Sequence, residues 1–217
     1  MRVLDSSFPN LTPKPHVQPT EHLASQIYTV DTLFTAAELS ALRSWAQNIT
    51  LDPPKPPGRG EAERTAFRTS FDSPSIATHL LSFLAPQIEA LTPRLRSPPL
   101  LSPNIRVYHY PPKTFFGPHY DSPTMDSRTR RLSCWTVLVY LTDGVEGGET
   151  VFYLDKEKEK ERGRRKKEPQ GERIAIAPQA GRVLFHWHGV AGGGCLRHEG
   201  REVTKGDKWV LRTDVLA

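Results

Sequence analysis

A histidine and a carboxylate separated by one residue indicate a metal site in this 217-residue sequence. His119 and Asp121 lie in the segment GPHYD. On an extended chain, side chains at positions i and i+2 point to the same side, so both can reach one ion. A third ligand must come from elsewhere, and His198, in the segment LRHEG, is the candidate. Two histidines and one carboxylate leave three adjacent positions of an octahedron open, which suits non-haem Fe(II) that binds an organic co-substrate and dioxygen.

A His-x-Asp pair alone often arises by chance, but here it lies within a longer ordered pattern. Four blocks follow one another between residues 104 and 215: IRVYHYPPKTFFGPHYD, TVLVYLTDGVEGGETVFY, APQAGRVLFHWH and LRHEGREVTKGDKWVLRTDV. In this order they resemble the Fe(II)/2-oxoglutarate-dependent dioxygenases, specifically the prolyl 4-hydroxylase-like branch. The stretch IYTVDTLFTAAEL resembles the start of that branch more loosely. The main resemblance covers about half of the chain.

The resemblance implies a set of iron ligands and a pocket for the co-substrate. His119, Asp121 and His198 match the catalytic metal ligands of the family. Lys208 matches the lysine that pairs with the distal carboxylate of 2-oxoglutarate, and Tyr110 matches a tyrosine whose hydroxyl group hydrogen-bonds the co-substrate. A five-carbon diacid that chelates iron at one end needs a cation deeper in the fold, and a lysine serves there as a point charge.

Four further residues have less specific assignments. Thr136 matches a polar residue near the same co-substrate carboxylate. Arg212 shares a strand face with Lys208 and lies four residues further along, so it is the alternative carboxylate partner or a substrate contact. Arg64 and Arg68 precede the strand-rich region, where this branch has arginines near the substrate cleft. Ordinary surface positions are the alternative for these two arginines.

The resemblance implies an Fe(II)- and 2-oxoglutarate-dependent hydroxylase, with ascorbate as the reductant. Such an enzyme uses O₂ to hydroxylate an unactivated C–H bond and releases succinate and CO₂. The residues leave two substrate classes open: a prolyl residue of a protein, and a free cyclic amino acid or related small molecule. A nucleic-acid demethylase of the same superfamily and a catalytically silent binding module with the same fold are the alternatives.

The elements that must position these residues change in type near residue 100. Before it, the sequence TAAE at residues 35–38 fits a capping box at the start of a helix near 36–48. Ser73 followed by proline fits the start of a second helix, which Pro86 should kink or divide. Later segments are short and separated by Gly, Pro and charged turns, which is typical of strands. Strands are expected near residues 104–110, 134–142, 149–154, 172–177, 182–187 and 207–215.

Helices followed by many strands predict an α+β protein with a barrel or sandwich. The resemblance makes this core a double-stranded β-helix, or jelly roll, with the N-terminal helices supporting one sheet. We expect one compact domain in three regions: a Pro-rich flexible arm at 1–26, a helical support region at 27–100 and the dioxygenase core at 101–217. A charged segment at 155–171 is expected to form a mobile loop within the core.

The net charge of +5 does not indicate nucleic-acid binding, because one segment supplies most of it. Residues 156–168 contain eight Lys or Arg and four Glu, a net charge of +4. Such a run is typical of a solvated loop, and a nuclear signal around Arg164–Lys167 is the alternative. The sequence has no apolar run of the roughly 20 residues that span a membrane, and its start lacks the apolar centre of a signal peptide. We therefore expect a cytoplasmic protein without membrane contact, in an oligomeric state that the sequence leaves open.

The two cysteines and the histidines outside the candidate metal site are interpreted mainly as structural residues. Cys134 and Cys195 are too few for a disulfide framework or a four-cysteine zinc site, and are expected to be packing thiols. His186 and His188 form a His-x-His pair like that of cupin metal sites, but the glutamate of the cupin pattern does not follow. His109 alternates with its neighbouring tyrosine and should face away from the site.

Overall fold

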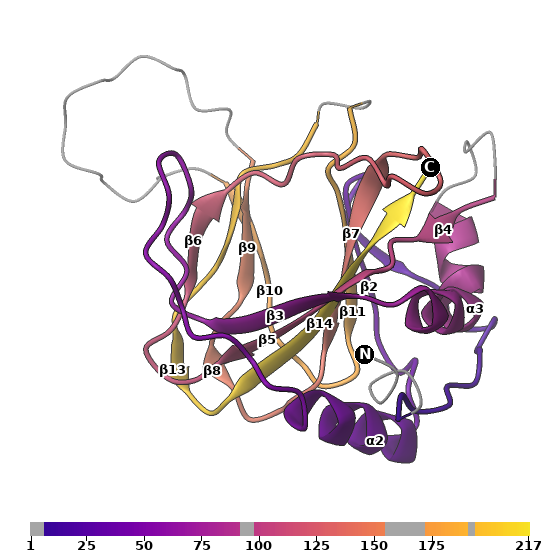
Figure 1. Cartoon of the computed structure of the whole chain (residues 1–217), viewed down its shortest axis with the longest axis horizontal. Helices are drawn as coiled ribbons and strands as arrows, with labels where there is room; N and C mark the ends of the chain where they lie inside the picture. Colours follow the sequence, from indigo (N-terminus) through magenta and orange to yellow (C-terminus); the bar gives the residue numbers. More distant parts are fainter. Residues whose placement is uncertain (1–6, 92–97, 155–171, 191–193) are drawn as a thin grey trace.

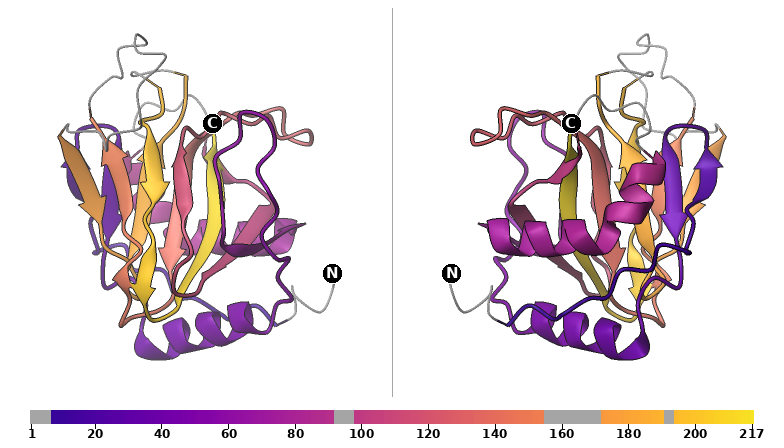
Figure 2. Two further views of the ribbon diagram at one scale, coloured as in Figure 1. Left: turned by 90° about the vertical axis from the view of Figure 1, so that its left-hand side faces the viewer. Right: turned by 90° about the vertical axis from the view of Figure 1, so that its right-hand side faces the viewer.

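Two antiparallel sheets face each other in the computed structural model of the chain, and two helices support the larger sheet (Figure 1, Figure 2). The structure describes residues 7–91, 98–154, 172–190 and 194–217. The charged segment 155–171, predicted to be a mobile loop, lies outside the described residues.

The larger sheet has eight strands, whose central members are buried along nearly their whole length. Helices cover one of its faces and the smaller sheet covers the other, so apolar side chains are buried on both. The strand order is β1 (Thr20–Leu23), β2 (Ile27–Val30), β11 (Val183–Trp187), β7 (Ser133–Tyr140), β14 (Lys208–Leu216), β5 (Asn104–Tyr110) and β3 (Phe67–Asp72), while β4 (Leu100–Leu101) pairs with β14.

The smaller sheet has four strands, and a separate two-stranded ladder lies beside it. The four are β10 (Arg173–Ile176), β9 (Thr150–Tyr153), β12 (His198–Gly200) and β6 (Phe116–His119), and the ladder joins β13 (Val203–Lys205) to β8 (Glu146–Gly147). All six predicted strands are present within two residues of their predicted bounds. The helices and the two open antiparallel sheets agree with the predicted α+β jelly-roll core.

Both predicted helices form where their capping residues indicate. α2 (Ala36–Gln47) begins after Thr35, whose hydroxyl accepts from the amide of Glu38 at 3.2 Å while the Glu38 carboxylate accepts from the Thr35 amide at 2.7 Å. α3 (Pro74–Leu91) begins after Ser73 and continues through Pro86 as one helix, so the proline does not divide it. Within the described residues, neither helix combines the length and the apolar character needed to cross a lipid bilayer.

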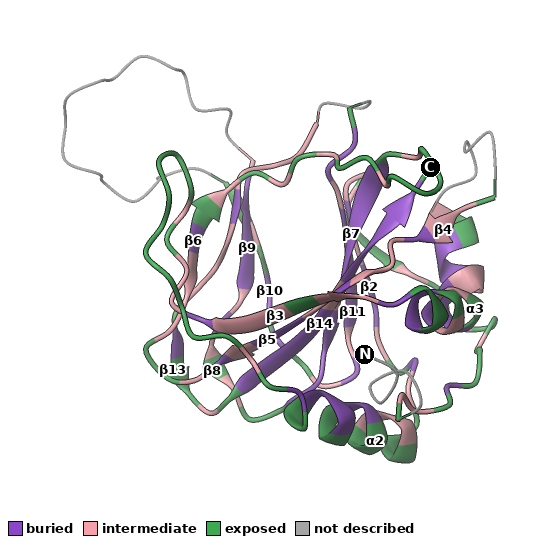
Figure 3. Ribbon diagram, in the orientation of Figure 1, coloured by how far each residue is buried: buried purple, intermediate pink, exposed green. Residues whose placement is uncertain are grey.

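The buried side chains form two layers, and Figure 3 shows that the strands between them are mostly buried. One layer joins the helices to the larger sheet and includes Leu42, Phe83 and Val137. The other includes Tyr140 and Phe152 and lies between the two sheets. The candidate site residues lie in this second layer.

From residue 7 onward, the segment predicted to be a flexible N-terminal arm packs against the helices. The Phe8 ring meets Trp45 edge-on, with ring centroids 4.9 Å apart, and Leu11 is buried. The side-chain amide of Gln87, on α3, donates to the carbonyl of Lys14 at 3.0 Å. This placement differs from the prediction, because the apolar side chains between the prolines cover surface that α2 and α3 expose.

Candidate active site

The two candidate ligand histidines lie on neighbouring strands of the smaller sheet. His119 ends β6 and His198 begins β12, and the antiparallel pairing places them directly opposite one another. Opposed residues of such a pair have Cα atoms about 4.5–5.5 Å apart, and the two imidazole centroids are separated by 4.3 Å. The third candidate, Asp121, follows two residues after His119. Strand pairing therefore brings the three predicted ligands together.

Backbone carbonyls orient both imidazole rings. Nδ1 of His119 lies 2.8 Å from the carbonyl oxygen of Gly117, and Nδ1 of His198 lies 2.9 Å from that of Leu196. A carbonyl oxygen can only accept, so in each ring Nδ1 carries the proton and donates it. Each Nε2 is left with a free lone pair, which is the form that binds a metal.

The carboxylate of Asp121 lies close to the unprotonated Nε2 atoms of both histidines. Its oxygens are 3.8 Å from Nε2 of His119 and 3.8 Å from Nε2 of His198. One ligand atom from each of the three residues can be chosen so that all lie within 4.8 Å of one another. Because metal–ligand bonds are about 2 Å long, one ion can bridge them. Two imidazole nitrogens and one carboxylate oxygen form a donor set that fits Fe(II).

The ionisation states also favour a metal. Burial lowers the pKa of His119 to about 4, and burial likewise lowers the pKa of His198. Burial opposes ionisation of Asp121, but the positive charge of Arg212, with the neighbouring histidines, holds the pKa of this carboxyl well below its usual value. At pH 7 the site therefore presents one carboxylate and two neutral imidazoles.

Arg212 and Thr136, predicted near the co-substrate, both contact Asp121. Nη2 of Arg212 donates to Oδ2 of Asp121 at 2.8 Å, and the Thr136 hydroxyl donates to the same oxygen at 2.8 Å. Nη2 of Arg212 also lies 3.3 Å from Oδ1 of Asp214. Two carboxylates thus hold the Arg212 guanidinium. Lys208, by contrast, has no carboxylate partner among the described residues.

A cavity of about 50 Å³ lies between the two sheets, next to His119 and His198. Lys208 and Tyr110 lie in its wall, and they are directly opposed in the pairing of β14 with β5. The larger sheet thus contributes the predicted co-substrate residues, and the smaller sheet contributes the two candidate ligand histidines, with Asp121 just after β6. The arrangement places a cation and a metal site on two sides of one enclosed space.

The ammonium group of Lys208 is buried, with 3% of the residue exposed, and among the described residues it has no carboxylate within ion-pair distance. Its Nζ donates to the carbonyl of Gly148 at 2.6 Å and lies 4.8 Å from the centroid of the Tyr110 ring. Burial lowers the pKa of Lys208 to about 7, and the charge of Glu149 opposes this only in part. A buried cation without a counter-ion is unfavourable. A carboxylate group of a ligand in this cavity would supply that counter-ion.

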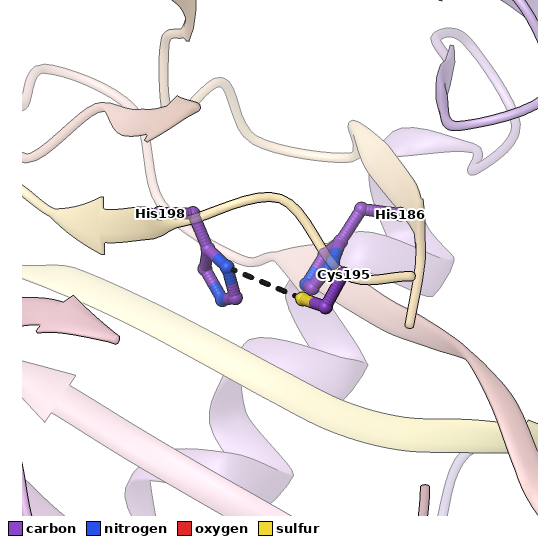
Figure 4. Close-up of side chains that lie close together, drawn as sticks. All are labelled: His186, Cys195 and His198. Atoms are coloured by element: carbon purple, nitrogen blue, oxygen red, sulfur yellow. Dashed lines mark hydrogen bonds between the residues drawn. The ribbon is translucent and has the colours of Figure 1, made fainter. Parts of the chain in front are cut away.

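His186 is a cavity residue that the sequence pattern does not assign to this site. It is 2% exposed, lies in the cavity wall, and within the described part of the chain its Nδ1 has no hydrogen-bond partner. Figure 4 shows His186, Cys195 and His198 close together, with the Cys195 thiol 3.8 Å from Nδ1 of His198. Burial raises the pKa of the Cys195 thiol to about 12, which suits a packing thiol. The His-x-His spacing indicates His186 as a candidate metal ligand, but spacing alone does not show that its side chain on β11 faces the cavity.

An open cleft of about 1430 Å³ lies outside the cavity, and His119 and Asp121 form part of its wall. Arg64 and Arg68 also line it. The Arg64 guanidinium lies 5.2 Å above the centroid of the Phe116 ring, which stacks on His119 with centroids 3.8 Å apart. The two predicted arginines therefore border the space from which a substrate would approach the candidate metal ligands.

Comparison with known proteins matches a sequence model of the 2OG-Fe(II) oxygenase superfamily to residues 105–213, about half of the chain. The chain is also similar to prolyl 4-hydroxylase 1 of Arabidopsis thaliana, with 36% identity over 110 residues. That similarity covers 48% of this chain and 38% of the plant protein.

Two solved structures share the fold at low sequence identity. A prolyl-4-hydroxylase of Pseudomonas putida has a TM-score of 0.59 and 16% identity, over 88% of this chain and 92% of that one. A prolyl hydroxylase from Trichoplax adhaerens, in complex with a peptide fragment of hypoxia inducible factor, has a TM-score of 0.58 and 14% identity, over 89% and 84%. These likenesses show the fold, and the match to the sequence model shows the family.

Proposed function

The chain belongs to the 2OG-Fe(II) oxygenase superfamily, and from this premise we propose that it hydroxylates an unactivated C–H bond with Fe(II), 2-oxoglutarate and O₂, releasing succinate and CO₂. One observation carries the proposal. A two-histidine, one-carboxylate donor set and a buried, uncompensated lysine lie at the same small cavity between the sheets. A carboxylate-bearing co-substrate would complement both.

We assign the metal to His119, Asp121 and His198. Bound iron would supply the redox chemistry that activates O₂. The chain orients the two Nε2 atoms through the carbonyls of Gly117 and Leu196, and it keeps Asp121 ionised through Arg212. These contacts fix the ligand atoms before the metal binds.

We assign the distal carboxylate of 2-oxoglutarate to Lys208, with the Tyr110 hydroxyl as a further hydrogen-bonding group. Both residues lie in the cavity wall and are buried, so the co-substrate would be held away from water. Arg212 is already held by Asp121 and Asp214, which argues against the alternative in which it binds this carboxylate.

The proposal is tested by turnover of the co-substrate. With Fe(II) and ascorbate as reductant, the purified protein should convert 2-oxoglutarate to succinate slowly even without its prime substrate, and proton NMR can follow this. Titration with Mn²⁺ and then 2-oxoglutarate under anaerobic conditions measures binding separately. A protein that binds neither ligand would contradict the proposal and favour a silent module with the same fold.

The affinity for 2-oxoglutarate should weaken as the pH rises above about 7. Burial lowers the pKa of Lys208 to about 7 in the ligand-free protein, and a bound carboxylate would raise it again. Binding above pH 7 therefore takes up a proton, and the Kd should rise by up to about tenfold per pH unit until the pKa of the complex is reached. Below pH 7, where Lys208 is charged in both states, the Kd should be constant. Calorimetry with Mn²⁺ between pH 6 and 9 measures this.

Lys208→Arg is the control for this pH dependence. A guanidinium stays charged throughout this range, so the Kd of the variant should not change with pH above 7. The same pH dependence in the variant and in the wild type would show that a different group titrates.

The substrate classes in this proposal are a prolyl residue of a protein and a free cyclic amino acid or similar small molecule. The similar plant and bacterial proteins are prolyl 4-hydroxylases, and one structural relative holds a peptide. The cleft of about 1430 Å³ beside His119 and Asp121 has room for either class. Arg64 and Arg68 are the residues we propose to contact the substrate.

Replacing Arg68 with alanine should raise the KM for the prime substrate while leaving slow succinate formation without substrate within about twofold of wild type. Arg68 lines the outer cleft but not the inner cavity, so only contacts to the substrate are lost. A hydrogen bond to a charged group contributes about 1.5–3 kcal/mol, which corresponds to roughly a tenfold to hundredfold increase in KM. Proline-containing peptides and free L-proline are the first probes. Arg43→Ala, on the exposed face of α2, is the matched control, and an equal effect of both variants would contradict the assignment.

A further inference from the structure

Asp121 is held by a chain of buried hydrogen bonds that continues well beyond its first contacts. The Thr136 hydroxyl, which donates to Asp121, also lies 3.0 Å from Nδ1 of His188. Nε2 of His188 lies 2.9 Å from the hydroxyl of Ser133, and that hydroxyl accepts from the amide of Thr124 at 2.9 Å. Thr136, His188 and Ser133 are each at most 3% exposed. The chain thus connects the candidate metal ligand to the start of β7 without access to solvent.

The direction of each hydrogen bond in this chain is determined by its two ends. Asp121 is ionised and can only accept, so Thr136 uses its single hydroxyl proton there. Thr136 must then accept from His188, which places the proton of that ring on Nδ1. Nε2 of His188 is therefore an acceptor and receives the hydroxyl proton of Ser133. With a neutral His188 ring, only this placement of the protons gives each of these buried groups a hydrogen-bond partner.

His188 is excluded as a metal ligand by the same contacts. Both of its ring nitrogens are engaged with hydroxyl groups, and its backbone amide donates to the carbonyl of Cys134 at 2.8 Å. Its ring centroid lies 6.5 Å from that of His186, the other histidine of the pair. His188 therefore acts on the site only through Thr136.

We infer that His188 is a positioning residue for Asp121: it holds the Thr136 hydroxyl in the orientation that fixes the carboxylate for metal binding. This inference rests on the proposed metal site at His119, Asp121 and His198. Without His188, the Thr136 hydroxyl loses its shorter donor and keeps only Nη2 of Arg212, at 3.2 Å. The same guanidinium is then the main restraint on both Thr136 and Asp121. Hydrogen-bond partners of metal ligands typically contribute about 10–100-fold to metal affinity.

The experiment measures Co²⁺ binding to the apoprotein, by affinity and by the visible absorption spectrum of bound Co²⁺, which responds to ligand geometry. His188→Phe should weaken the Kd for Co²⁺ by about tenfold or more and change the spectrum, because phenylalanine fills the space but cannot donate to Thr136. Thr136→Val should weaken binding at least as much. Because His188 acts through Thr136, the double variant should be no weaker than Thr136→Val alone.

Two conservative variants provide the rescue. Thr136→Ser keeps the hydroxyl, and His188→Gln keeps one donor and one acceptor, so both should bind Co²⁺ within about threefold of wild type. If His188→Phe does not fold, the comparison of Thr136→Val with Thr136→Ser, together with His188→Gln, still decides the question. A Thr136→Val protein with the affinity and spectrum of wild type would overturn the inference, as would strictly additive losses in the double variant.

A histidine–threonine pair at the edge of the larger sheet, on β1 and β2, provides a control. Nε2 of His22 lies 2.8 Å from the hydroxyl of Thr29, a buried residue of β2, and neither residue lines the cavity or the cleft. His22→Phe should leave the affinity and the spectrum of Co²⁺ unchanged. His119→Ala separates the proposed metal site from the role of His188. If His119→Ala retains tight Co²⁺ binding, the proposed metal site is wrong. If His119→Ala loses binding but the His188 and Thr136 variants do not, only the role of His188 is wrong.

Discussion

Replacing His198 or Asp121 with alanine is expected to abolish turnover of 2-oxoglutarate and to weaken metal binding by more than about 100-fold. Loss of an outer hydrogen-bond partner alone costs about 10–100-fold in metal affinity, and loss of a direct ligand should cost more. His198→Ala removes one of the two Nε2 atoms that the strand pairing sets side by side. Asp121→Ala removes the carboxylate and also leaves Arg212 without its closest partner. Calorimetric titration with Mn²⁺ and an assay for succinate measure the two effects.

Stability must be measured beside these activities, because the two variants differ in what they leave behind. Unpairing a buried charge completely costs about 3–5 kcal/mol. Asp121→Ala removes one of the two carboxylates that hold Arg212 and leaves Asp214, so it should lower the Tm of the apoprotein by part of that cost. His198→Ala leaves no buried charge unpaired and should lower it less. His109→Phe is the control, since His109 stacks on Trp209 and pairs with Asp207 away from the cavity. Turnover that survives in either ligand variant would disprove the proposed metal site.

The second large effect is expected from Lys208→Ala, which should raise the KM and the Kd for 2-oxoglutarate by a factor of about 100 or more. The distal carboxylate would then enter a buried cavity without its cation. Removing one partner of a buried charge pair typically costs about 3–5 kcal/mol, which corresponds to this factor. The kcat at saturating co-substrate should fall much less, because Lys208 does not contact the candidate metal ligands. Succinate formation at varied 2-oxoglutarate, with anaerobic calorimetry, separates the two parameters.

Lys205→Ala is the matched control for this prediction. Lys205 lies three residues earlier, is exposed, and pairs with Glu146 at 2.8 Å, so its loss should leave the KM unchanged. Arg212→Ala provides the discriminating comparison. If it raises the KM for 2-oxoglutarate more than Lys208→Ala does, then Arg212 is the anchor for the distal carboxylate.

Local patterns in the sequence were sufficient to predict both helices and six of the fourteen strands in the described part of the chain. The capping box before α2 and the alternating segments that become β5 and β14 depend on neighbouring residues, so their position along the chain can be inferred from the sequence. The other eight strands were missed. Seven of them have two to four residues, which is too few for a periodic pattern, and the six-residue β3 lies in the region that was expected to be helical. The packing of the N-terminal segment was also not predicted, because it depends on surfaces that α2 and α3 supply.

The sequence by itself determined which residue types could form the site, and the tertiary structure decided which of them meet. His-x-Asp spacing indicates two metal ligands on one strand end, and the family resemblance indicates the third. That His198 lies opposite His119, that Arg212 holds Asp121 and that His188 reaches Asp121 through Thr136 all depend on strand register. Register is set by the packing of whole sheets, in which residues distant in sequence become neighbours, and spacing along the chain carries little information about it.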